Sequence, residues 1–540
     1  MAATSPTATR PAAAALIRVP RSGINRVSLP CCHRRATPWR RPPRCSRKGK
    51  PVVTDVVEEE APRGPETKRE DDEEAEAGSL SGALGWLRLD GVAADIISIA
   101  VPAVLALAAD PITALVDTAF VGHIGSAELA AVGASASVFN LVSKLFNVPL
   151  LNVTTSFVAE QQAVDANSSS TTGQRDEFLT PQKKVLPAVS TSLALAAGIG
   201  LLEMVALIVG SGTLMNIIGI PVDSPMRAPA EQFLTLRAYG APPIIVALAA
   251  QGAFRGFLDT KTPLYAVGAG NLLNAILDAV LIFPLGLGVS GAALATVSSE
   301  YLTAFILLWK LNNEVDLFSW NIVGDGVIRY LKSGGLLIGR TIAVFLTLTL
   351  STSLATREGP VPMAGYEICL QVWLTISLLN DALALAGQAL LASEYAKGNY
   401  KQARMVVSRI LQVGGVTGVV LAATLFIGFG SLSLLFTDDP AVLDVAQSGV
   451  WFVTISQPIN AIAFVADGLY YGVSDFAYAA YSTFFAGAVS SVFLLIAAPK
   501  FGLGGIWAGL TLFMSLRAIA GFWRLGSKGG PWEIIWSESE

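Results

Sequence analysis

Two aspartates, Asp110 and Asp117, interrupt the end of an apolar run that begins near Ile96 and is long enough to cross a bilayer. A charge at membrane depth costs roughly 2.5–3.5 kcal/mol on insertion scales, so it faces protein or a water-filled cavity and has a role there. Their spacing of seven places both carboxylates on one helix face. Pro102 and Pro111 each remove a backbone hydrogen bond and should bend this helix. We interpret Asp117 as functional and Asp110 as part of the kink.

A second polar group lies in a later apolar run, "PLYAVGAGNLLNAILDAVLIF". Asn274 and Asp278 are four residues apart and share a helix face, which puts an amide oxygen beside a carboxylate. With a hydroxyl such as that of Thr296, they are the hard oxygen ligands that a small cation prefers. The same carboxylates, close together and partly desolvated, could carry a proton instead. The structural alternative is a polar network that only fixes helix packing, at about 0.6 kcal/mol per bond.

Polar side chains also recur in apolar runs of the second half of the chain. One set follows steps of three and seven, so it forms a single stripe on a helix. We interpret the stripe and a second group as candidates for lining a wet cavity that binds substrate. These candidates are Gln457, Asn460 and Asp467 in the stripe and Asn380, Asp381 and Gln388 in "LLNDALALAGQALLA".

Enzymatic chemistry has little support in this sequence. It contains no HExxH, no GxSxG in a strand context, no Walker loop and no DDxxD-type cluster. Cys369 is the one cysteine that follows the N-terminal segment, and His33 and His123 are the two histidines, so thiolate or histidine metal sites are not expected. We therefore predict no catalytic residue, no resident metal and no cofactor. Without an ATP-binding module, uphill transport has to use an ion gradient.

The elements that carry these residues are predicted membrane spans. Hydrophobic residues make up 52% of the 540 and charged residues only 14%, which indicates a polytopic membrane protein. Apolar windows of about 20 residues predict twelve helices. The predicted spans are 96–121, 134–158, 186–210, 236–257, 264–284, 290–310, 328–352, 363–390, 406–430, 446–471, 478–498 and 504–524.

The two halves of the chain resemble each other. "GFLD" from Gly256 and "GLGVSGAAL" from Gly286 both match segments 216 residues later, and "GSAELAAV" from Gly125 matches a segment 234 residues later. Six spans per half is an even number, so both halves cross in the same sense. The predicted fold is all-α, with two six-helix lobes related by a pseudo-two-fold axis along the membrane normal and substrate between them.

The N-terminal segment is predicted to be a targeting peptide. The first fifty residues contain twelve Lys or Arg and no Asp or Glu, and an acidic, proline-containing stretch follows. Loops on the side of the mature N-terminus hold fourteen basic residues against four on the other side, which predicts that both termini face the plastid stroma, or the matrix if the organelle is a mitochondrion. The predicted organisation is a plastid transit peptide (1–50), an acidic disordered linker (51–90), the first lobe (91–312), an inter-lobe loop (313–327), the second lobe (328–526) and a tail (527–540).

Four segments carry a family resemblance: "DPITALVDTAFVGHIGSAELAAVG", "QGAFRGFLDTKTPLYAVGAGNLLN", "GLGVSGAALATVSS" and "FVADGLYYG". They resemble the multidrug and toxic compound extrusion (MATE) family, in its DinF-like plant branch with plastid targeting, over about residues 90–525. The resemblance implies two six-helix lobes around a V-shaped central cavity. It places the first-span aspartate on Asp117 and the proline where that helix bends on Pro102.

The resemblance also implies a cation site in the first lobe. This site falls on Asn274, Asp278 and Thr296, with the fourth-span polar position on Gln251, where an asparagine would be expected. Arg340 stands in a span where other branches use a glutamate for coupling, which puts a coupling site in the second lobe in doubt.

The predicted function is secondary antiport in a plastid membrane. An organic solute, such as citrate, a phenolic carboxylate or a xenobiotic, would leave in exchange for H⁺ or Na⁺. The expected partners are this small solute and the lipid bilayer, with no nucleic acid, and the oligomeric state is open. A passive pore or a lipid-head-group flippase of similar architecture is the alternative.

Overall fold

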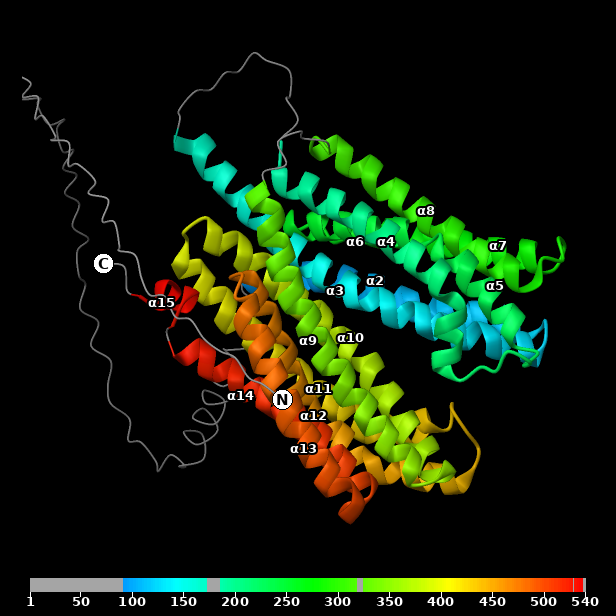
Figure 1. Ribbon diagram of the computed structural model, residues 1–540. Coiled ribbons are helices and arrows are strands. Elements are labelled where there is room, and N and C mark those ends of the chain that lie inside the picture. The colour runs from blue at the N-terminus through cyan, green and yellow to red at the C-terminus, as the bar shows by residue number, and fades with distance from the viewer. Residues whose placement is uncertain (1–90, 172–184, 318–323, 528, 538–540) are drawn as a thin grey trace, which may run out of the picture. The chain divides into compact units, whose positions relative to one another are not determined.

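The computed structural model describes residues 91–171, 185–317, 324–527 and 529–537; the predicted transit peptide and acidic linker lie outside them. The described chain is built from α-helices (Figure 1). Those of the first half are α2 (Gly91–Gly122), α3 (Ser126–Thr171), α4 (Pro187–Ile218), α5 (Arg227–Ala238), α6 (Ala241–Gly256), α7 (Lys261–Ile282) and α8 (Gly288–Glu314). Those of the second are α9 (Gly324–Arg357), α10 (Pro360–Ala396), α11 (Tyr400–Ser433), α12 (Pro440–Gly472), α13 (Phe476–Phe501), α14 (Leu503–Gly526) and α15 (Pro531–Trp536).

The all-helical membrane fold predicted from the sequence is confirmed. Within the described residues, eleven helices are long and apolar enough to cross a bilayer, and the pair α5 and α6 together supplies a twelfth span. Prolines mark the beginnings of several helices. They occupy the first turns of α4, α10 and α12, where their missing N–H is tolerated. The side chains of Asn399 and Asp439 cap α11 and α12.

The fourth span, predicted as one helix over 236–257, is broken. Helix α5 ends at Ala238, α6 begins at Ala241, and the two axes are bent by 45°. Pro242 and Pro243 explain the break, because proline cannot donate the backbone hydrogen bond that would continue α5 but fits the first turn of α6. Gly240 lies at the break, where a Cβ would collide with the carboxylate of Glu300.

The internal repeat is visible in the backbone. Leu258 and Ser474, which lie 216 residues apart, both have positive φ angles of 64° and 58° and are the two non-glycine residues of the described chain that do so. Each follows an equivalent helix, α6 in the first half and α12 in the second. A rarely populated conformation at matching positions is strong support for two related halves.

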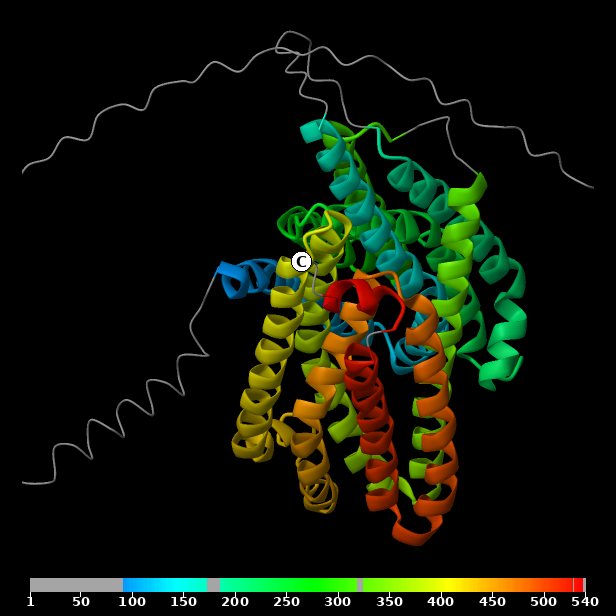
Figure 2. The same cartoon turned by 90° about the vertical axis from the view of Figure 1, so that its left-hand side faces the viewer.

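Close helix packing repeats as well. Gly200 of α4 lies against Pro242 of α6, and Gly418 of α11 lies against Pro458 of α12. At both glycines a Cβ would come within 2.6 Å of the proline Cα, so only glycine fits. Helices α2–α8 form the first lobe and α9–α14 the second; Figure 2 shows α11–α14 side by side.

The lobes contact each other toward the end of the bundle where α2 begins and α3 ends. There the Gln388 amide of α10 donates to the Asn152 carbonyl and the Ser156 hydroxyl of α3, and Ser156 donates to the carbonyl of Tyr471 on α12. A buried apolar cluster surrounds these bonds and includes Ile96 and Phe157 from the first lobe. The two lobes are therefore packed together at this end.

The predicted tail contains a docked helix. In α15 the side chains of Trp532 and Ile535 are fully buried, and Arg404 of α11 donates to the carbonyls of Ile535 and Ser537. At the other predicted boundary, α9 begins at Gly324, four residues before the expected start of the second lobe.

Candidate functional site

Two helices of the first lobe bring together Asp117, Asn274 and Asp278. The Asn274 side-chain nitrogen donates to Asp117 Oδ1 at 2.6 Å and to Asp278 Oδ2 at 3.3 Å. Asn274 and Asp278 are fully buried and Asp117 is partly buried. Asn274 Oδ1 and Asp278 Oδ1 have no hydrogen-bond partner. The i, i+4 spacing on α7 thus produces the predicted amide and carboxylate pair, and the packing of α2 against α7 adds the second carboxylate.

The two other residues expected at this site are less directly engaged. The Thr296 hydroxyl on α8 donates to the carbonyl of Ala292 in its own helix, at 2.9 Å. Gln251 on α6 is buried, but no hydrogen bond joins it to the three residues above. Pro102 and Pro111 both lie inside α2, which runs as one helix through them.

An ion pair at the helix break lies near this acidic group. Arg237, in the last turn of α5, bonds both carboxylate oxygens of Glu300 on α8 at 2.5 and 2.6 Å. Its guanidinium lies 4.1 Å from the ring centroid of Phe139, and its charge acts on Asp117. Sequence reasoning did not include this arginine in the site. The residues that could have indicated it are the glycine and two prolines that follow it, because they predict a helix break next to a charged side chain.

The six cavity candidates of the second lobe do not form one open surface. Asp381 is exposed, and the other five are buried. Gln388 bonds α3 across the lobe interface, Gln457 bonds the carbonyl of Val453 in its own helix, and Asn380 has no partner for either side-chain atom. Asn460 contacts the Ser456 hydroxyl at 3.4 Å.

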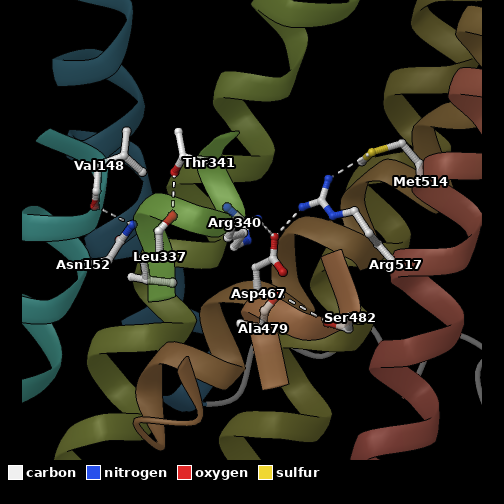
Figure 3. Close-up of polar contacts among 10 residues, drawn as sticks. All are labelled: Val148, Asn152, Leu337, Arg340, Thr341, Asp467, Ala479, Ser482, Met514 and Arg517. Atoms are coloured by element: carbon white, nitrogen blue, oxygen red, sulfur yellow. Dashed lines mark hydrogen bonds and ion pairs between the residues drawn. The ribbon is translucent and has the colours of Figure 1, made fainter. Parts of the chain in front are cut away.

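Asp467 has partners that spacing alone could not supply. Arg340 of α9 and Arg517 of α14 both donate to its Oδ2 atom, so three helices meet at one carboxylate oxygen (Figure 3). The side chains of Arg340, Asp467 and Arg517 are 12%, 9% and 6% exposed. Sequence reasoning noted Arg340 but could not bring it or Arg517 to Asp467, because the two arginines are 127 and 50 residues away along the chain.

Comparisons with known proteins agree with this architecture. The MatE family model matches residues 181–280 and 337–496. The chain is 66% identical over 446 residues to Protein DETOXIFICATION 44, chloroplastic, of Arabidopsis thaliana, covering 83% of this chain and 84% of that protein. The chain belongs to the MATE family. It is also 47% identical to Protein DETOXIFICATION 45, chloroplastic, of Arabidopsis thaliana, with 81% of this chain and 79% of that one covered.

Solved MATE structures share the fold. "Crystal structure of MATE in the bent conformation" superimposes with a TM-score of 0.72 at 19% identity, covering 81% of this chain and 95% of that one. The DNA damage-inducible protein F of Escherichia coli is a more distant relative, 25% identical over 80% of this chain and 92% of its own length. This chain is therefore a MATE efflux transporter with many membrane spans. Members of this family handle small organic compounds in a membrane. They are transporters and not enzymes, and they need no cofactor.

Proposed function

We propose that this MATE protein is a secondary antiporter of a plastid membrane. It exports an organic solute, an organic or phenolic carboxylate such as citrate or a xenobiotic, in exchange for H⁺ or Na⁺. Both termini face the stroma. The observation that carries the proposal is the group of Asp117, Asn274 and Asp278, which holds two carboxylates around one buried amide.

The chemistry of this group suits a transported cation. Two carboxylates held close together repel each other unless a proton or a cation lies between them. The unpartnered Oδ1 atoms of Asn274 and Asp278 are hard oxygen donors, the type that Na⁺ prefers, and one shared proton would also relieve the repulsion. The group therefore has a binding capacity that the protein itself leaves unused.

Helix α2 offers a physical route from ion to solute. Its second half carries Asp117, whereas its first half packs into the apolar cluster shared with the second lobe through Ile96 and Ile99. Pro102 and Pro111 lie between these regions and weaken the helix there. Ion binding that repositions Asp117 would change how α2 packs between the lobes. Exchange requires only that the ion and the solute each bind the two orientations of the transporter with different affinities.

Transport in proteoliposomes tests the proposal. Asp117→Asn combined with Asp278→Asn should abolish exchange driven by a proton or Na⁺ gradient, with loaded citrate, phenolic acids and a cationic dye as solutes. Asp444→Asn, an exposed carboxylate at the start of α12, is the matched control and should keep wild-type exchange. Equal, gradient-independent flux from wild type and double variant would instead support the pore or flippase alternative.

A further inference from the structure

The second lobe contains a charge cluster that the ion site does not use. Arg340, Asp467 and Arg517 come from α9, α12 and α14, and both guanidinium groups donate to the same oxygen of Asp467 (Figure 3). All three side chains are nearly removed from solvent. One carboxylate oxygen therefore serves two cations.

Two further charges interact with this cluster. Asp381 of α10 is the next carboxylate within electrostatic range, and Arg255 of α6 is a further cation that acts on it. The group linked in this way contains three arginines and two aspartates. Burying a cation without a counterion is unfavourable, so the net charge of the cluster favours one more anionic group.

An exposed carboxylate lies within electrostatic range of the cluster. Asp381 is exposed although it lies midway along α10. The arginines that act on it come from both lobes, Arg255 from the first and Arg340 and Arg517 from the second. Asp381 is therefore the exposed member of a charge group to which both lobes contribute.

Both arginines retain hydrogen-bonding capacity. The Nε atoms of Arg340 and Arg517 are buried and have no partner. A guanidinium binds a carboxylate best through two parallel N–H groups, so each arginine offers a face that Asp467 leaves partly unused. Aromatic rings lie alongside: those of Phe464 and Phe513 are each 5.4 Å from the Arg517 guanidinium, centroid to Cζ.

We propose that Arg340 and Arg517 form the recognition site for the carboxylate of the transported solute, and that Asp467 is a built-in competitor for it. This inference rests on the proposed transport function and names the class of its substrate, an aromatic carboxylate anion. Asp467 neutralises part of the site when it is empty. The substrate carboxylate enters past Asp381, takes the unused guanidinium donors and loosens the bonds to Asp467.

Equilibrium binding to the full-length protein in detergent, with no ion gradient, tests the site. The probes are 4-hydroxybenzoate and its neutral isostere 4-hydroxybenzamide. Wild type should bind the acid at least about tenfold more tightly than the amide, because a hydrogen bond to a charged group contributes enough free energy for a tenfold difference in affinity. Arg517→Gln should reduce this preference to near equality. Asp467→Asn should tighten binding of the acid, since the internal competitor becomes neutral.

Arg524→Gln is the matched control. Arg524 lies seven residues after Arg517 on α14, pairs with Asp475 at 2.8 Å and lies 4.7 Å from the ring of Tyr478, so it has the same kind of partners away from the cluster. This variant should bind the acid as wild type does. Arg517→Lys keeps the charge without the planar fork and should bind with intermediate affinity, which separates charge from geometry.

Two results would overturn the inference. One is equal wild-type affinity for acid and amide, which needs no variant and no assumption about folding. The other is weaker acid binding in Asp467→Asn, which would mean that the three residues only brace the lobe. Because binding is measured without a gradient, a wild type that shows no preference for the acid but retains gradient-driven exchange would refute this site and not the proposed antiport. If the Asp117 and Asp278 variants lose exchange but still bind the acid, the proposed carboxylate site is not contradicted.

Discussion

At the scale of single residues, Asn274 has the most informative position in the first lobe. Its nitrogen donates to both carboxylates, and its oxygen accepts no hydrogen bond. The nitrogen stabilises the charged forms of Asp117 and Asp278, whereas the oxygen is available to a metal cation. Removing the amide therefore has opposite effects on the two ions that could drive exchange.

Asn274→Ala should reveal which ion is used. If H⁺ is coupled, losing a hydrogen bond to a charged group makes the carboxylates hold protons more tightly, and the pH of half-maximal exchange should rise by about one unit. If Na⁺ is coupled, losing an oxygen ligand should raise the half-saturating Na⁺ concentration about tenfold. Both are measured as initial exchange rates in proteoliposomes. Asn312→Ala, an exposed asparagine near the end of α8, should change neither, and an unchanged Asn274→Ala would rule out its role at the ion site.

At the scale of elements, the sequence predicted what local spacing determines. Asn274 and Asp278 share a face because they lie i, i+4 on one helix, and the polar stripe of α12 follows from the same geometry. The bend in the fourth span was also present in the sequence, as glycine followed by alanine and two prolines at 240–243, but apolar windows average over such a short signal. The helix in the predicted tail is equally short, and burial of Trp532 stabilises it rather than propensity.

Helix pairs in the two lobes should depend on glycine in the same way. Gly418→Ala on α11 places a methyl group 2.6 Å from Pro458 Cα, and overpacking of this kind costs about 1–3 kcal/mol. Gly415→Ala on the same helix meets nothing within 4 Å and should be neutral or slightly stabilising. Thermal unfolding in detergent compares the two. Gly200→Ala and its control Gly198→Ala repeat the test on α4. Equal unfolding temperatures within each pair would contradict the packing assigned to these helices.

At the scale of the whole molecule, the repeat is structural but the polar groups are not duplicated. The offsets that relate the halves carry Asp117 to Ser351 and Asp278 to Leu494, so the second lobe lacks an equivalent acidic pair. Asp467 corresponds to Gln251, which has no arginine partners. The two lobes therefore divide the proposed work, with the ion in the first and the solute carboxylate in the second. Sequence comparison between halves reveals this asymmetry, but only packing shows that Arg340 and Arg517 meet at Asp467.

Exchange between two orientations requires the packed end of the lobes to open, and Gln388 makes two of the hydrogen bonds that join the lobes there. Its amide makes two hydrogen bonds to α3, and neutral bonds of this kind contribute about 1 kcal/mol each. Gln388→Ala should therefore raise the population of the open state by roughly tenfold or more. The reporter is Val153→Cys, buried in the apolar cluster shared by the lobes, in a chain without other cysteines.

Labelling of this cysteine by a membrane-impermeant maleimide should accelerate in Gln388→Ala by the same factor as the open population. Gln371→Ala is the matched control, because Gln371 is exposed on the same helix and its side chain donates to Glu367 one turn away. It should label at the parent rate. If Gln388→Ala also labels at the parent rate, the apolar cluster and the remaining bonds between the lobes, such as Ser156 to Tyr471, hold them together. The buried amide then contributes to local packing without biasing the two orientations.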